Sequence, residues 1–411
     1  MPTRPTVFGQ LLQLLPFSHF EHLVHKHQSN WYAKDFTAWA HLVCLLYAHL
    51  SRRDGLRDLV ACLNAQQPLL YHLGVRARVA RSTLADANES RNCRLFEDLS
   101  QRLVSIAQEL YQVPHLTLEA LSAGPLQESE SWDCTAPLYA MDSSTIELCM
   151  SLFPWAKYRR SSAAVKLHAV IDLRGCIPVM LRITEGRVAD VFLLEELRLP
   201  AGSFVIFDRG YLDFEGFHKL VQRGCHFVTR ARSDLAFETV RSLQPTNVSN
   251  DANTAGSSLG VQSDLIIHLK TVKSKRAYPK PLRRVRFVDA DTAQELVFLS
   301  DRLDLQALQI AQLYKQRWQV ELFFKWLKQH LCIKHFYGTS DNAVKSQIWC
   351  AICAYLLLLI AHKPHAKSLP MHTFIHLVET NLFSCISLSD LVKTTISQPL
   401  EGLSGSQIKL L

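Results

Sequence analysis

Glycine and proline are scarce in this chain, and charged residues are only moderately abundant. Its 411 residues include 15 glycines and 16 prolines, which excludes collagen-like and low-complexity structures. Charged residues make up 20% and hydrophobic residues 48%, a balance that is ordinary for globular proteins and excludes extensive disorder. We therefore expect two or three domains, each with its own core.

The sequence also lacks the marks of a secreted or membrane-spanning protein. Its 11 cysteines are scattered and odd in number, which argues against a disulfide framework and for a reducing compartment. The most apolar run, 348–361, is shorter than the roughly 18–20 residues that cross a bilayer. We expect a buried core helix there, with Cys350 and Cys353 as buried thiols rather than a redox or metal pair. The first residues resemble no signal peptide, so we expect a cytoplasmic protein without a membrane partner.

Acidic residues are outnumbered by basic ones, 37 against 45, which gives a net charge of +8. The excess is concentrated, because residues 270–286 contain no acidic side chain. A solvated surface normally mixes the two signs, so an unbroken basic run predicts contact with phosphates. Pro279 and Pro281 favour a hairpin-like tip over a helix there. The predicted DNA-contacting residues of this run are Lys270, Lys273, Lys275, Arg276, Lys280, Arg283, Arg284 and Arg286.

The first 130 residues are predicted to form an all-helical N-terminal domain, because apolar residues recur at three- and four-residue intervals. A turn carrying Arg76, Arg78 and Arg81 precedes a polar segment, and Ser82 is the predicted N-cap of the helix that follows. This outline fits a helix-turn-helix that reads DNA, and equally a helical bundle with a charged surface.

Beyond residue 130 the pattern changes to short β-branched and apolar segments interleaved with two amphipathic ones. Such a pattern indicates an α/β fold, a mixed sheet with helices packed on its faces. The predicted divisions are a first part of this core at 131–232, a β-strand-rich insertion with the basic run at 233–302, and a helical region at 303–411.

Three acidic residues stand out by their surroundings. Asp142 lies inside an apolar strand-like segment, and Asp208 ends another, at the edge where open α/β sheets place ligands. Glu321 lies in a predicted helix, where Tyr314, Arg317 and Lys328 fall within a narrow stripe beside it at 100° per residue. Taken one at a time, these residues also fit a turn or a salt-bridged amphipathic helix.

Together the three acids can supply a cluster of carboxylates. Such a cluster repels itself without cations, so it predicts Mg²⁺ or Mn²⁺, which prefer oxygen ligands. Two such ions can activate a water or hydroxyl nucleophile and stabilise the leaving oxygen of a phosphodiester. Arg317 and Lys328 would then lie near the scissile phosphate.

These motifs resemble the DDE transposases of the insertion-sequence family 4 type. The resemblance rests on MDSSTI around Asp142, on FDRGY around Asp208, and above all on the spacing of Tyr314, Arg317, Glu321 and Lys328. The N-terminal segments FGQLLQLLPFSHFEHLV and STLADANESR also resemble the domain that accompanies one branch of the family.

The resemblance implies a ribonuclease-H-like catalytic core, with helices on both faces of its sheet, that is interrupted by a β-rich insertion before the last catalytic helix. It implies that Asp142, Asp208 and Glu321 bind two Mg²⁺ or Mn²⁺ ions and catalyse strand cleavage and transfer. The implied partners are double-stranded DNA, as terminal inverted repeats and target, and a second copy of the chain in a homodimer.

The sequence departs from relatives that stack a flipped base on a tryptophan of the insertion, because no tryptophan occurs between residues 156 and 317. If a DNA hairpin forms, Phe237, Tyr278 or Trp318 is the candidate stacking residue.

Other polar residues carry weaker predictions. Arg209 suits either a phosphate contact or a salt bridge within its turn. Lys166 and His168 alternate with apolar neighbours, so both side chains are predicted to share a face of one strand, with a structural role for the histidine or a place in the cleft.

Two further functions stay open at this point. An inactive remnant would occupy transposon ends without cutting them, and a two-metal nuclease would cut DNA without transferring strands. The complete acidic trio argues against the remnant, and the N-terminal domain with the basic insertion argues against the simple nuclease.

Overall fold

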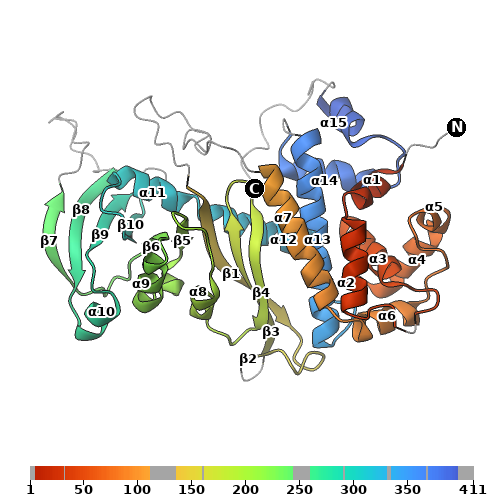
Figure 1. The fold of residues 1–411 in the computed structure, drawn as a ribbon, viewed down its shortest axis with the longest axis horizontal. Helices are drawn as coiled ribbons and strands as arrows, with labels where there is room; N and C mark the ends of the chain where they lie inside the picture. Colours follow the sequence, from red (N-terminus) through yellow and green to blue (C-terminus); the bar gives the residue numbers. More distant parts are fainter. Residues whose placement is uncertain are drawn as a thin grey trace. The chain divides into compact units, whose positions relative to one another are not determined.

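The computed structural model describes residues 5–31, 33–111, 136–159, 162–243, 260–289, 292–330, 335–366 and 369–396. These residues separate into two compact units (Figure 1). One unit combines the helices up to Leu110 with those from Leu327 onwards, and the other is built on the sheet between Tyr111 and Trp326. The boundary predicted at residue 130 lies outside the described residues, and the C-terminal helices group with the N-terminal ones rather than with the sheet.

The helical unit confirms the prediction of an all-α N-terminal region. Its helices are α1 (Val7–Gln13), α2 (Phe17–Lys26), α3 (Ala38–Leu50), α4 (Leu56–Ala65), α5 (Gln67–His72), α6 (Arg81–Ser90), α7 (Arg94–Tyr111), α13 (Asp341–His365), α14 (Met371–Thr380) and α15 (Leu388–Ile396).

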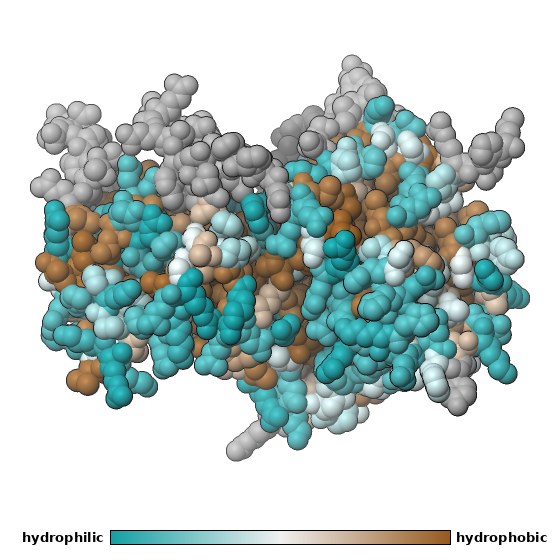
Figure 2. All heavy atoms as spheres, viewed as in Figure 1, coloured by the Kyte–Doolittle hydropathy of each residue, from teal (hydrophilic) through white to brown (hydrophobic). Residues whose placement is uncertain are grey.

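Helix α13 forms the centre of this unit. Within the described residues it is the one helix long and apolar enough to cross a membrane by length and composition, and 94% of its most apolar window is buried inside the protein. It packs against α1, α3, α6, α14 and α15. On the face that Figure 2 displays, hydrophilic residues predominate over the helices. Cys350 and Cys353 are fully buried, and burial raises the pKa of both thiols. The predicted core helix with buried thiols is therefore confirmed.

The helix after the basic turn begins two residues earlier than predicted. Helix α6 starts at Arg81, and its N-cap is Ala80, whose side chain makes no capping hydrogen bond, so Ser82 lies inside the first turn. Leu84 and Ala87 are buried where α6 packs against α4 and α13. The predicted DNA contacts Arg76, Arg78 and Arg81 are all exposed.

The second unit contains a ten-stranded mixed sheet, in agreement with the predicted fold class. Its strands run in the order β2-β3-β1-β5-β6-β10-β9-β8-β7, and β4 pairs with β3. The strands are β1 (Leu138–Leu148), β2 (Lys157–Arg159), β3 (Ser162–Asp172), β4 (Ile177–Glu185), β5 (Phe204–Phe207), β6 (His226–Arg230), β7 (Phe237–Leu243), β8 (Gly260–Leu269), β9 (Leu282–Val288) and β10 (Glu295–Ser300).

The pairing divides this sheet into a core and an extension. Strands β1, β3 and β4 form an antiparallel group, and β1, β5 and β6 pair in parallel, as expected for a ribonuclease-H-like core. The four strands of the predicted insertion are antiparallel to one another and join the same sheet, because β10 pairs with the free edge of β6. The insertion thus extends the core sheet.

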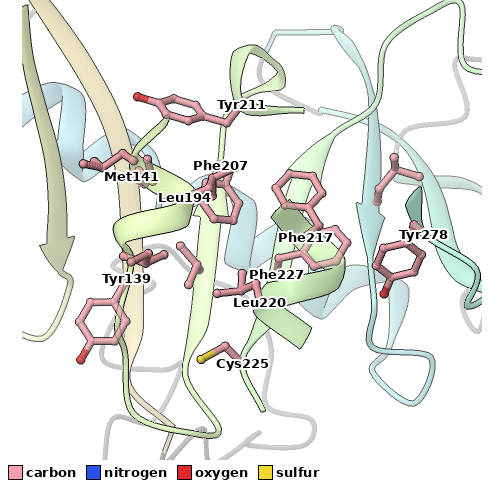
Figure 3. Packing of buried hydrophobic residues seen from close by; sticks show 14 of the residues in the cluster. Tyr139, Met141, Leu194, Phe207, Tyr211, Phe217, Leu220, Cys225, Phe227 and Tyr278 are labelled. Atoms are coloured by element: carbon pink, nitrogen blue, oxygen red, sulfur yellow. The ribbon is translucent and has the colours of Figure 1, made fainter. Parts of the chain in front are cut away.

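Helices cover both faces of the sheet. The short helices η2 (Asp190–Phe192) and α8 (Leu193–Glu196), and then α9 (Phe214–Gln222), lie on one face. There Phe207, Phe217 and Phe227 pack with Met141 and Tyr211 in a single buried cluster (Figure 3). Helix α11 (Ala307–Lys315) covers the other face.

The basic run departs from the prediction in two respects. It contains a short helix, α10 (Val272–Ala277), before the two prolines. Arg283, on β9, is 5% exposed and is paired with the buried carboxylate of Asp264 on β8 at 2.6 Å. The prediction that Arg283 contacts DNA is therefore wrong, because its guanidinium is committed to an interior ion pair.

The two ion pairs made by arginines of β9 differ in burial, which predicts that they contribute differently to the stability of the protein. Replacing Arg283 with Met leaves the Asp264 carboxylate buried and unpaired, which should lower the free energy of unfolding by about 3–5 kcal/mol. Arg286, also on β9, is paired with the exposed Glu295, so Arg286→Met is the matched control and should leave the urea midpoint nearly unchanged. Equal effects of the two substitutions in urea unfolding would contradict this assignment.

Candidate active site

Three neighbouring strands bring two acids and one base into a row, in the middle of β1 and at the ends of β5 and β6. Met141 on β1 pairs with Phe207 on β5, which pairs in turn with Thr229 on β6. The next residues are Asp142, Asp208 and Arg230, and neighbouring strands lie about 4.8 Å apart. Because residues in register share a face, all three are placed on the side of the sheet that α11 covers. The two aspartates predicted from the sequence are therefore neighbours.

The third acid comes from the helices on that face, which are interrupted where one continuous helix was predicted. Helix α11 ends at Lys315 and α12 (Trp318–His330) begins after a turn at Gln316 and Arg317. The backbone amide of Arg317 donates to the carbonyl oxygen of Tyr314, an i→i+3 bond that tightens the chain as in a 3₁₀ turn. The break places Arg317 in the turn and Glu321 in the first turn of α12.

Arg317 joins two of the acids directly. Its Nη1 atom lies 3.2 Å from Oδ2 of Asp142, and its Nη2 atom lies 2.5 Å from Oε1 of Glu321. The other oxygen of Asp142 accepts from the backbone N–H of Ser143 at 2.8 Å. A single guanidinium therefore holds the strand carboxylate and the helix carboxylate together.

Asp208, the remaining acid of the three, is held by the phenol of Tyr314. The hydroxyl of Tyr314 donates to Oδ1 of Asp208 at 3.2 Å, and the Tyr314 ring packs on Phe298 of β10 with ring centroids 4.8 Å apart. The structure thus brings together Asp142, Asp208, Tyr314, Arg317 and Glu321, although they come from four separate segments.

The electrostatics of the site show a shortage of positive charge. Burial raises the pKa of Asp142 to about 6, and the negative charges of Glu321 and Asp208 add to the rise, against the lowering effects of the Ser143 amide and Arg317. Although burial disfavours the charge of Arg317, its neighbours Tyr314, Glu321 and Asp142 raise its pKa above the ordinary value. The cluster therefore favours a further cation or an additional proton.

The donor set suits a hard divalent ion, because it consists of three carboxylates with oxygen ligands. Within the described residues, however, no three His, Cys, Asp or Glu side chains lie close enough to hold one ion. The guanidinium of Arg317 lies between Asp142 and Glu321, where it balances their charge. The three carboxylates fit a metal ion by their chemistry, and for an ion to bind between Asp142 and Glu321 the guanidinium of Arg317 must move away from them.

Arg317 also has a donor to spare. Its Nε atom is buried and finds no hydrogen-bond acceptor among the residues that the structure describes. A buried donor without a partner is costly, and a phosphate oxygen is a suitable acceptor for it.

Arg230 is a residue that the sequence patterns did not single out. It is half-buried, and it forms no ion pair within the described ranges. Burial raises the pKa of Tyr314, and the positive charge of Arg230 opposes that rise. Its segment was recognised as a strand, but only the pairing of β5 with β6 places it beside Asp208.

The remaining motif residues lie at the edges of this arrangement. Arg209 directly follows Asp208 and is exposed. Lys328 lies two turns beyond Glu321 on α12 and is half-buried. Neither is joined to the three acids by the contacts described above.

Lys166 and His168 share a face of β3, as predicted, but they point away from the acids. Lys166 Nζ lies 2.8 Å from Oδ1 of Asp190, on η2, and His168 Nε2 lies 3.0 Å from the hydroxyl of Thr184. This is the face that η2 and α8 cover, so His168 has a structural role and lies outside the cleft.

The other predicted DNA contacts differ in availability. Lys270, Lys273, Lys275, Arg276 and Lys280 are exposed on or beside α10, and within the described residues none of the five is held in an ion pair. Arg286 is exposed but paired with Glu295. The guanidinium of Arg284 lies over the ring of Phe237, 4.8 Å from its centroid.

The three candidates for stacking a flipped base also differ. Tyr278 is 1% exposed and belongs to the core of the sheet unit, and one face of Phe237 is covered by Arg284. Trp318 is 57% exposed and follows Arg317 directly, which leaves it as the best placed of the three.

Comparison with known proteins assigns the family. The family model of the transposase DDE domain matches residues 133–357, and a domain of unknown function (DUF4372) matches residues 3–76. "Putative transposase y4zB" of Sinorhizobium fredii is 34% identical over 323 residues, which cover 78% of this chain and 81% of the relative. A probable transposase for insertion sequence element IS5377 of Geobacillus stearothermophilus is 31% identical over 54% of this chain and 56% of its own length. The chain therefore belongs to the DDE transposases of insertion sequences, and it is an enzyme that acts on DNA.

Proposed function

We propose that this enzyme binds the terminal inverted repeats of an insertion sequence, cuts the DNA strands at the ends and joins the freed 3′ hydroxyl groups to target DNA. The observation that carries the proposal is the arrangement of the three acids on one face of the sheet: Arg317 joins Asp142 to Glu321, and strand pairing places Asp208, bonded by Tyr314, beside Asp142. It would act as a homodimer on double-stranded DNA, in the cytoplasm at the nucleoid.

Members of this family generally depend on divalent metal ions, and we propose that the three carboxylates bind two Mg²⁺ or Mn²⁺ ions. When bound, these ions would activate the attacking water or hydroxyl and stabilise the leaving oxygen. Tyr314 keeps the Asp208 carboxylate oriented through its hydrogen bond.

The basic side chains around the acids suit a DNA phosphate. Once it leaves the carboxylates, the planar fork of Arg317 can bind a phosphate in bidentate fashion. Arg230, Arg209 and Lys328 would add positive charge around the same strand. The exposed lysines and Arg276 of the α10 region would hold the DNA backbone without reading its sequence.

The same assay separates this function from the two alternatives. DNA bearing the ends of the element, incubated with the protein and Mg²⁺, should give joined products. Nicks alone would indicate a nuclease, and a shifted but uncut band would indicate an inactive remnant.

Loss of any one of the three carboxylates should abolish cleavage but spare DNA binding. Asp142→Asn, Asp208→Asn and Glu321→Gln should each reduce the rate of end cleavage by more than about 100-fold, because even residues that only support metal ligands cost 10- to 100-fold. The matched control is Glu147→Gln, an exposed acid on the same strand as Asp142, which should cut at the normal rate. Cleavage at the wild-type rate by any of the first three variants would remove that residue from the site.

Removing Arg317 should affect metal binding and catalysis in opposite directions. In Arg317→Gln the cation between Asp142 and Glu321 is gone, so free protein should bind Mn²⁺ more tightly, by roughly tenfold, while cleavage of end-bearing DNA slows. Electron paramagnetic resonance of free Mn²⁺ measures the first effect, and a gel assay measures the second. Arg182→Gln, which removes an arginine paired with Glu196, serves as the control. Weaker Mn²⁺ binding by Arg317→Gln would show that Arg317 does not compete with the metal ion for the carboxylates.

The α10 surface should contribute affinity that depends on salt but not on sequence. A variant with Lys273, Lys275, Arg276 and Lys280 replaced by Ala should bind all DNA more weakly. Its slope of log affinity against log salt should fall by about one for each lost phosphate contact. Lys219→Ala is the control, because that lysine is paired with Glu215. An unchanged slope in fluorescence-anisotropy titrations would show that the DNA lies elsewhere.

A further inference from the structure

A second polar cluster lies on the opposite face of the sheet, directly behind the proposed site. The Oδ1 atom of Asp190, on η2, lies 2.8 Å from Nζ of Lys166 and 3.3 Å from Nδ1 of His168. Both partners belong to β3 and are largely buried, with 14% and 0% of their side chains exposed. None of these groups belongs to the catalytic set that the sequence predicts.

This cluster reaches the strand that carries Asp142. In the pairing of β1 with β3, His168 lies opposite Ser143, the residue that follows Asp142. Although burial opposes the shift, the side chains of His168, Lys166 and Ser143 hold the pKa of Asp190 below its ordinary value. The carboxylate of Asp190 therefore remains charged beside Ser143, whose backbone amide donates to Asp142.

The cluster also reaches the turn that carries Asp208. The backbone amide of Tyr211 donates to the carbonyl oxygen of Asp208 at 3.0 Å. The Tyr211 side chain is 2% exposed and lies in the apolar cluster with Met141 and Phe207 (Figure 3). Burial raises the pKa of Tyr211, the charge of Asp190 adds most among the charged neighbours, and Ser143 opposes the rise. The Tyr211 hydroxyl is buried and has no hydrogen-bond partner among the described residues. Its turn, η3 (Arg209–Tyr211), packs against η2, which carries Asp190.

The cluster lies close to the point where the pairing of β1 with β5 ends, because His168 is opposite Ser143. The ladder between β1 and β5 ends at the pair Met141 and Phe207. Asp142 and Asp208 come immediately afterwards, where the pairing of β1 with β5 no longer fixes their spacing. Asp142 is still paired with Ala169 of β3, and Asp190, the only charged group of η2, is held on the same strand by Lys166 and His168.

We propose that Asp190 is a positioning residue of the active site. Its pairs with Lys166 and His168 hold η2, which packs against the turn after Asp208, on β3, the strand that pairs with β1 at Ser143. Asp190 thereby sets the spacing of the two carboxylates from behind the sheet. This inference rests on the proposed function, because the spacing matters for the binding of divalent ions.

The alternative is a purely structural ion pair, and a double variant separates the two roles. Asp190→Asn leaves the charge of Lys166 with little compensation, so it should lower the melting temperature, and it should weaken Mn²⁺ binding by about 10-fold or more. Combining it with Lys166→Met removes both charges and should restore most of the melting temperature. If Asp190 positions the aspartates, Mn²⁺ binding by the double variant stays weak.

The measurements are Mn²⁺ titrations followed by electron paramagnetic resonance, without DNA, and thermal unfolding of the same samples. Glu196→Gln, which removes an exposed acid on the same side of the sheet, should change neither quantity. Tyr211→Phe keeps the buried ring and removes only a hydroxyl that has no hydrogen-bond partner among the described residues, so it should fold normally and bind Mn²⁺ as the wild-type protein does.

Recovery of wild-type Mn²⁺ affinity in the double variant would overturn the proposal, and so would normal affinity in Asp190→Asn. Absence of Mn²⁺ binding by the wild-type protein would instead overturn the proposed function, and with it this role of Asp190.

Discussion

The arrangement depends on the repulsion between carboxylates that the fold forces together. Asp142 and Asp208 are brought side by side by the pairing of β1 with β5, and α12 adds Glu321. Negative charges at such separations are tolerated in a partly buried site only when a proton or a cation offsets them. In this structure Arg317 supplies that cation for two of the acids. Burial, with a smaller contribution from the charges of Glu321 and Asp208, still raises the pKa of Asp142.

This constraint explains why one motif supplies both a base and an acid. Arg317 and Glu321 are four residues apart and interact across one turn of helix, while the break before α12 turns the same guanidinium toward Asp142. The charge that offsets these two carboxylates is then already next to the place where a DNA phosphate must arrive.

Much of the fold and of the site could be predicted from the sequence because its signals are local. Asp142 and Asp208 interrupt or end apolar strands, and Glu321 lies at fixed spacing from Tyr314 and Arg317. The core helix α13 was visible in its apolar run. The turn at Gln316 was not predicted, since neither glycine nor proline marks it.

The rest depended on contacts between distant segments. Arg283 appeared to be one more phosphate contact until β8 and β9 paired it with Asp264, 19 residues away. Arg230 acquired its importance only from the register of β5 with β6. The basic run and the acidic residues were recognisable as residue types, but which of them face solvent, each other or the core follows from strand pairing.

The central claim is that three carboxylates from separate segments form one metal site from which Arg317 is displaced. Anomalous diffraction from crystals of the full chain soaked in Mn²⁺ tests it most directly. The account predicts manganese peaks bounded by the side chains of Asp142, Asp208 and Glu321, with the Arg317 guanidinium moved off both carboxylates. Manganese bound elsewhere, or Arg317 unmoved between Asp142 and Glu321 at saturating Mn²⁺, would contradict it.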